Sequence, residues 1–194
     1  MTAVLESLFL YVVFFAPDLY TEPAGIIIFS VQQELSRVVL YGILIIYLLF
    51  RLKIIAPDML KPHFNDIPAC GLALVLLFLT GFCVGFFVQD FQMIKGPKGI
   101  IPVFVAILSC LLTGYAEEGF FRIYLLRNHS PCSIVYRMLI ATVLFSLCHW
   151  YEGISGMLYA AAASLILSLI SLKFRSLHGI ALAHGLYDLI VWLN

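Results

Sequence analysis

Charged residues are scarce in this chain of 194 residues, where Asp, Glu, Lys and Arg together make up 11%. An average soluble domain carries about 25%. Hydrophobic residues make up 63% instead. A soluble fold of this size cannot hide that much apolar surface, because it still exposes roughly 30% of what its unfolded chain exposes. Disorder is excluded as well, since it depends on low hydrophobicity and high charge. We therefore expect the chain in a lipid bilayer.

Other features are missing too, and each excludes a class of protein. The 11 basic residues are balanced by 11 acidic ones, so no basic field is available for nucleic acid. The five cysteines form no Cys-x-x-Cys pair and are read as small apolar residues. A His-Glu-x-x-His helix, the usual motif of soluble zinc proteases, is absent. No Lys or Arg precedes the first apolar stretch, so a cleaved signal peptide is not expected.

Unbroken apolar runs predict membrane helices rather than the alternating strands of a barrel. Counting about 20 residues per crossing gives the expected spans 3–16, 25–50, 67–91, 100–126, 133–150, 153–172 and 177–193. The first is short for a crossing. The predicted fold is all-α, a polytopic membrane bundle of six to seven transmembrane helices that forms a single integral membrane domain over residues 1–194.

The distribution of Lys and Arg predicts the orientation, because cytoplasmic links carry the excess of positive charge. An alternating path places most of these residues on one side, which we assign to the cytoplasm: Arg51, Lys53, Lys61, Arg127, Arg137, Lys173 and Arg175. The opposite links hold only Lys95 and Lys98. With seven spans, the N-terminus is cytoplasmic and Asn194 lies outside.

Ionisable groups inside membrane helices cost at least about 2.5–3.5 kcal/mol each, which makes them functional candidates. In Glu117-Glu118-Gly-Phe-Phe-Arg122, Glu118 and Arg122 are four residues apart and can form an ion pair. Glu117 points about 100° away from that face and keeps a reactive carboxylate. The alternative is a structural ion pair with a spare acid.

Two further helices carry polar groups at the same spacing. Phe145 and His149 are four residues apart, so the phenyl ring can brace the imidazole; an interfacial histidine is the alternative. His184 and Asp188 share one face of the last helix, either as a site or as a structural hydrogen-bonded pair. His178 falls off that face and is read as interfacial.

Lipid tolerates such groups only inside the bundle, so we expect a wet internal cavity holding Glu117, His149, His184 and Asp188. Two chemistries fit it. A carboxylate and a histidine can activate water for amide hydrolysis while other donors bind the oxyanion. Alternatively, Glu117, His149 and His184 hold a zinc ion with an open position. The predicted boundaries raise one conflict, because Glu117 and His149 would differ by well over 10 Å in depth.

The three motifs, Glu-Glu-x-x-x-Arg, Phe-x-x-x-His and His-x-x-x-Asn/Asp, follow one another on successive expected helices. This order resembles the CAAX-protease and bacteriocin-processing family of intramembrane proteases, also called CPBP or Abi. The resemblance runs from Glu117 to Asp188. The N-terminal half offers no motif to compare.

The resemblance implies that Glu117 activates water with His149, and that His184 and Asp188 stabilise the oxyanion. Glu118, Arg122 and Phe145 would support the site. It implies no catalytic metal, with zinc as the alternative. Where the family has asparagine, it donates a hydrogen bond that an ionised aspartate cannot. Asp188 is therefore expected to be protonated, to orient His184, or to hold a metal.

The function expected from the resemblance is that of an intramembrane endopeptidase in the plasma membrane of a prokaryote. Its partners would be the bilayer and a membrane-associated peptide or protein, such as a prenylated tail, a bacteriocin leader or a sorting signal. A non-catalytic immunity factor or scaffold is the second hypothesis. A proton-coupled transporter is the third, because Glu and His chains relay protons. No repeat or paired broken helix supports that third reading.

Overall fold

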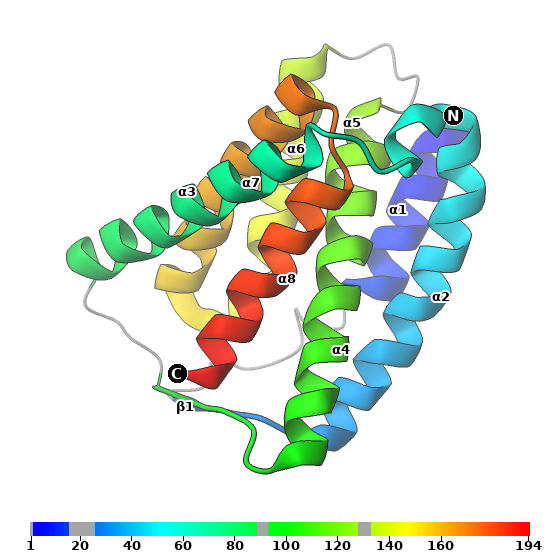
Figure 1. Cartoon of the computed structure of the whole chain (residues 1–194). Helices are drawn as coiled ribbons and strands as arrows, with labels where there is room; N and C mark the ends of the chain where they lie inside the picture. Colours follow the sequence, from blue (N-terminus) through cyan, green and yellow to red (C-terminus); the bar gives the residue numbers. More distant parts are fainter. Residues whose placement is uncertain (1, 16–25, 89–92, 128–132) are drawn as a thin grey trace.

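The computed structural model describes residues 2–15, 26–88, 93–127 and 133–194, and these residues form a helical bundle (Figure 1). Its helices are α1 (Thr2–Phe14), α2 (Val31–Ile55), α3 (Asp66–Phe87), α4 (Ile100–Glu117), α5 (Leu125–Arg127), α6 (Ile134–Cys148), α7 (Gly153–Phe174) and α8 (His178–Leu193). A π-helical segment, η3 (Glu118–Tyr124), joins α4 to α5, and short 3-10 turns lie at η2 (Pro57–Leu60) and η4 (Trp150–Glu152). The all-α class is confirmed. A two-stranded parallel sheet of β1 (Ile26–Ile28) and β2 (Met93–Lys95) was not predicted.

Four helical stretches are long and apolar enough to cross a membrane: Val31–Ile55, Asp66–Phe87, Ile100–Arg127 and Trp150–Phe174. The helices α1, α6 and α8 have 13, 15 and 16 residues, fewer than the roughly 20 that a crossing needs. Six or seven crossings therefore stay a prediction. Large apolar side chains such as Ile43, Phe82, Phe104 and Leu158 lie exposed on the outside, as expected where helices face lipid.

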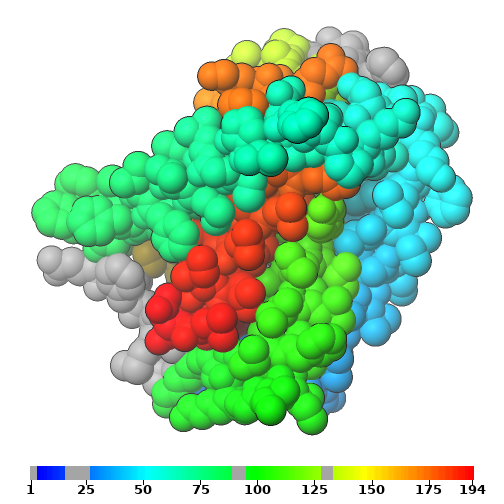
Figure 2. Space-filling view, viewed as in Figure 1, coloured from blue at the N-terminus to red at the C-terminus, as the bar shows by residue number. Residues whose placement is uncertain are grey.

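Helix α8 occupies the middle of the bundle, packed against α3 on one side and α4 on the other. Helix α2 packs beside α4, while α7 packs against both α6 and α3. In Figure 2 the surface of α8 is visible between α3, which crosses above it, and the lower end of α4. The two helices that carry the first and third sequence motifs are thus direct neighbours.

Glycines allow α4 and α8 to approach at backbone distance. A Cβ atom at Gly185 would lie 2.7 Å from the Cys110 carbonyl oxygen, and one at Gly114 would overlap the Ala181 carbonyl oxygen. Small residues at helix crossings permit such contact in membrane proteins. This close crossing brings His184 of α8 within reach of the acids at the end of α4.

Replacing Gly185 with alanine is expected to force these helices apart. Overpacking of this kind costs about 1–3 kcal/mol, which lowers the melting temperature in detergent by roughly 2–12 °C for a chain of this size. The matched control is Gly42→Ala in α2, where an added Cβ meets nothing within 4 Å. That change should be neutral or slightly stabilising, since alanine is the better helix former. Equal effects of the two changes would contradict the close crossing.

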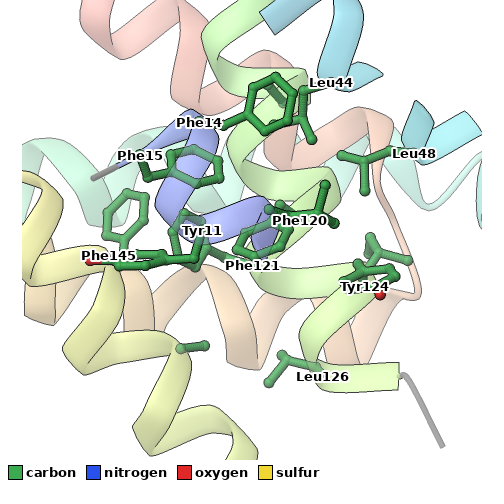
Figure 3. Packing of buried hydrophobic residues seen from close by; sticks show 14 of the residues in the cluster. Tyr11, Phe14, Phe15, Leu44, Leu48, Phe120, Phe121, Tyr124, Leu126 and Phe145 are labelled. Atoms are coloured by element: carbon green, nitrogen blue, oxygen red, sulfur yellow. The ribbon is translucent and has the colours of Figure 1, made fainter. Parts of the chain in front are cut away.

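Aromatic side chains fix the position of η3 within the bundle (Figure 3). The Phe121 ring centroid lies 4.9 Å from that of Phe15 in the segment after α1 and 5.1 Å from that of Phe145 in α6. Phe120 lies 5.1 Å from Phe15. All seven residues of η3 are buried. The segment that carries Glu118 and Arg122 is therefore held by packing from several helices.

Candidate active site

Glu117 and Glu118 lie at the junction where α4 gives way to η3. A π-helical turn closes through wider hydrogen bonds than an α-helix and is found mostly at functional sites. Both glutamates are buried, with 7% of Glu117 and none of Glu118 exposed. The change in helix type thus coincides with the paired acids of the first sequence motif.

Glu118 is held between Arg122 and His184. Its Oε2 lies 3.1 Å from Arg122 Nε in a fully buried ion pair, at the four-residue spacing that the sequence predicted. Its Oε1 accepts a hydrogen bond from His184 Nδ1 at 2.8 Å. Arg122 also stacks on the Phe145 ring, with its guanidinium carbon 4.2 Å from the ring centroid. Glu118 therefore joins η3 to α8, a contact that the sequence did not predict.

Glu117 faces a different set of groups. Its Oε1 accepts a hydrogen bond from the Tyr41 hydroxyl of α2 at 3.3 Å. Its Oε2 lies 3.7 Å from His184 Nε2 and has no hydrogen-bond partner among the described residues. Glu117 thus keeps one carboxylate oxygen without a hydrogen-bond donor beside the imidazole.

His184 is the centre of the site. Its Nδ1 meets Glu118, and its Nε2 lies 3.7 Å from Glu117 and 3.5 Å from Asp188 Oδ2. About 9% of the His184 side chain is exposed, compared with 28% for Asp188. The site is therefore deeply buried at the two glutamates and more open at Asp188.

His149 directly follows α6 as its C-cap residue, and a backbone contact sets its tautomer. Its Nδ1 lies 2.8 Å from the Phe145 carbonyl oxygen. A carbonyl only accepts, so Nδ1 carries the hydrogen and Nε2 presents a lone pair when the ring is neutral. The Phe145 ring lies between the two histidines, 4.7 Å from His149 and 6.0 Å from His184. In the described residues no hydrogen bond or ion pair joins His149 to Glu117.

The predicted conflict of depth between Glu117 and His149 was wrong. Helix α6 has only 15 residues and spans about 22 Å, less than the roughly 30 Å of a bilayer core. Its first turn is tied to α5, because Arg137 donates to the Leu126 carbonyl oxygen at 2.5 Å. Counted along the helices from this contact, Glu117 lies about 14 Å away and His149 about 18 Å. The two residues therefore stand at similar depth.

The described residues bear on two further predictions, the zinc alternative and the wet internal cavity. Within the residues that the structure describes, no group of three His, Cys, Asp or Glu side chains is arranged to hold a metal ion. His184 Nδ1 is engaged by Glu118, so Nε2 is the nitrogen of this ring that a metal would use, and the zinc set of Glu117, His149 and His184 stays a prediction. Two hollows among the described residues, of about 370 and 30 Å³, are lined by other residues than the four proposed ones. The wet cavity stays a prediction.

Tyr41 is the residue that the sequence motifs missed. It is buried in α2, outside all three motifs, and nothing in its local spacing relates it to Glu117. One signal was available, because a tyrosine inside a membrane helix must place its hydroxyl against a polar partner. The contact adds α2 to the elements that form the site. His178, expected at the interface, begins α8 and lies within hydrogen-bond distance of the Tyr115 hydroxyl and the Leu60 carbonyl oxygen.

A bundle with long apolar helices and a buried acid–histidine centre defines a class, the polytopic membrane proteins with an internal polar site. Comparison of the sequence with models of known protein families narrows this class. The model of the family described as Type II CAAX prenyl endopeptidase Rce1-like matches residues 99–190. Residues 99–190, just under half of the chain, therefore match an Rce1-like domain of the CPBP family. No curated protein and no solved structure matches the chain.

The matched range contains every residue of the three motifs, from Glu117 to Asp188, and excludes Tyr41. Family membership implies a protease, and with the four long apolar helices it indicates an integral membrane protein with a protein substrate. The resemblance inferred from the motifs is confirmed.

Proposed function

We propose that this protein is an intramembrane endopeptidase that hydrolyses a peptide bond in a membrane-associated or lipidated tail. The observation that carries the proposal is the convergence of Glu117, Glu118 and Asp188 on the buried ring of His184. Three carboxylates around one imidazole are costly inside a bilayer. Such an arrangement is expected where a reaction uses the groups.

Glu117 and His149 activate the attacking water. The free Oε2 of Glu117 and the Nε2 lone pair of His149 are both proton acceptors. A water between them loses a proton as its oxygen bonds to the scissile carbonyl carbon. The same proton then passes to the leaving nitrogen as the C–N bond breaks. The products are a carboxylic acid and an amine, and no other reactant is consumed.

His184 and Asp188 stabilise the oxyanion that forms on the carbonyl oxygen. His184 Nδ1 is engaged by Glu118, so Nε2 donates only if the cluster holds a further proton. Charge counting supports such protons, because three carboxylates face one arginine, Arg122, among the buried groups that the structure describes. A protonated Asp188 supplies a second donor, in place of the asparagine that the family motif allows.

Glu118, Arg122 and Phe145 position the reacting groups. Glu118 fixes the His184 ring, Arg122 balances the charge of Glu118, and Phe145 contacts Arg122 and both imidazoles. The proposed reaction needs no cofactor, as the resemblance implies, and a zinc ion held by Glu117, His149 and His184 is the alternative.

The proposal places one membrane domain, residues 1–194 with six to seven crossings, in the plasma membrane of a prokaryote. Substrate classes are prenylated tails, bacteriocin leaders and C-terminal sorting signals. An immunity or scaffold protein of the same family would make no use of the proton acceptor on His149, and a proton-coupled transporter would show substrate flux in vesicles.

A change at His149 tests the function. His149→Gln keeps a side chain of similar length that cannot take a proton, so cleavage of a fluorogenic farnesylated peptide should fall about 10²-fold or more. The matched control is His63→Gln, at a histidine that contacts the Arg175 carbonyl oxygen outside the site. Unchanged cleavage by folded His149→Gln protein in membranes would contradict the proposal and favour a non-catalytic role or a different chemistry.

A further inference from the structure

A polar hollow of about 370 Å³ lies at the end of the bundle where four chain segments meet. Its lining comes from the end of α2 and η2, from α5, from the start of α6 and from the end of α7: Ile55, Ala56, Asp58, Leu126, Arg127, Ile134, Arg137, Leu172 and Arg175. This volume is within the range of small-molecule sites, roughly 300–1,000 Å³. The hollow shares no lining residue with the proposed active site.

Positive charge dominates the hollow. Three arginines, Arg127, Arg137 and Arg175, and one acid, Asp58, are among the residues that line it. Asp58 is paired with Arg175, whose hydrogen bond holds the pKa of Asp58 below its ordinary value. Arg127 Nε is buried and has no hydrogen-bond partner among the described residues. Like charges gathered in one partly buried space repel each other, and an anion in the hollow would relieve that repulsion.

The backbone at Arg175 supports the same conclusion. Arg175 caps α7 in the left-handed conformation, with φ 51° and ψ 38°, and is the one non-glycine residue with positive φ in the described chain. Glycine usually occupies this position because side chains are strained there. The strain is tolerated here with an arginine whose guanidinium reaches the hollow. This is the combination expected where the side chain serves a ligand.

We propose that this hollow binds a phosphate group, carried by an anionic lipid headgroup or present as free phosphate. Arginine forks match phosphate oxygens and bind them with charge-assisted hydrogen bonds. Basic pockets between membrane helices on the cytoplasmic side are typical headgroup sites, and the links that carry most of the Lys and Arg residues meet at this end. Four apolar side chains provide a wall for the lipid part: Ile55, Leu126, Ile134 and Leu172.

The test measures binding to the full chain in detergent, with phosphatidic acid, diacylglycerol and inorganic phosphate as probes. The double change Arg127→Gln with Arg175→Gln should weaken the Kd for phosphatidic acid at least about tenfold, because two charged hydrogen-bonding groups are removed. The matched control, Lys53→Gln with Lys173→Gln, removes the same charge at the same end but outside the hollow. It should leave the Kd unchanged.

The remaining probes separate the sources of phosphate. Competition by inorganic phosphate would show that the phosphate group alone is enough, and failure to compete would assign the site to a lipid. Equal binding of diacylglycerol, or equal weakening in the lysine variant, would overturn the proposal. Arg175→Gly controls for misfolding, because glycine suits the left-handed conformation at the end of α7. This variant should keep the melting temperature of the unmodified protein and bind phosphatidic acid more weakly. Unchanged binding of phosphatidic acid would overturn the proposed phosphate site.

Discussion

Glu117→Gln protein is expected to fold normally and to lose about 10³-fold of its peptide-cleaving rate. The amide keeps the size of the side chain and can still accept the Tyr41 hydrogen bond. It cannot take a proton from water, and loss of a general base typically costs 10²–10⁴-fold. The measurement is the initial rate of farnesylated-peptide cleavage by purified protein in lipid nanodiscs.

Two further variants test whether this loss is specific to the Glu117 carboxylate. Glu117→Asp restores the carboxylate but shortens the side chain by one methylene. A misplacement of about 1 Å can itself cost 10²-fold, so the cleavage rate of Glu117→Asp should fall between that of the unmodified protein and that of Glu117→Gln. Glu6→Gln applies the same chemical change to an acid that pairs with Arg51 outside the site and should leave the rate unchanged. Near-normal cleavage by Glu117→Gln would remove Glu117 from the water-activating role.

The local geometry of the site could be predicted from the sequence because the pitch of a helix is fixed. Residues four apart share a face, so Glu118 with Arg122 and His184 with Asp188 were expected as pairs, and the structure has them at 3.1 and 3.5 Å. Glu34 and Arg37, three residues apart on α2, form a pair of the same kind at 3.0 Å. These contacts depend only on helix formation.

The contacts between helices could not be predicted in this way. The hydrogen bonds from His184 to Glu118 and from Tyr41 to Glu117 join residues 66 and 76 positions apart. Their formation depends on how α2, α4 and α8 cross. The π-helical form of η3 was not predicted either. Hydropathy alone extended the fifth helix to residue 150, whereas α6 ends at Cys148.

Arg122→Met is expected to be the most destabilising single change in the site. The arginine is fully buried and pairs with the equally buried Glu118. Removing one partner of a buried ion pair leaves an uncompensated charge and costs about 3–5 kcal/mol. For a chain of this length that corresponds to a fall of roughly 6–20 °C in melting temperature.

The double change Arg122→Met with Glu118→Gln should recover much of this loss. The glutamine carbonyl can still accept the hydrogen bond from His184 Nδ1, while the charge that needed Arg122 is gone.

The matched control is Arg51→Met, which breaks a partly exposed ion pair with Glu6 and should cost less than about 1 kcal/mol. Melting curves of the four proteins in one detergent provide the comparison. A small shift for Arg122→Met, equal to that of Arg51→Met, would mean that the buried charge of Glu118 is balanced by His184 and does not depend on Arg122.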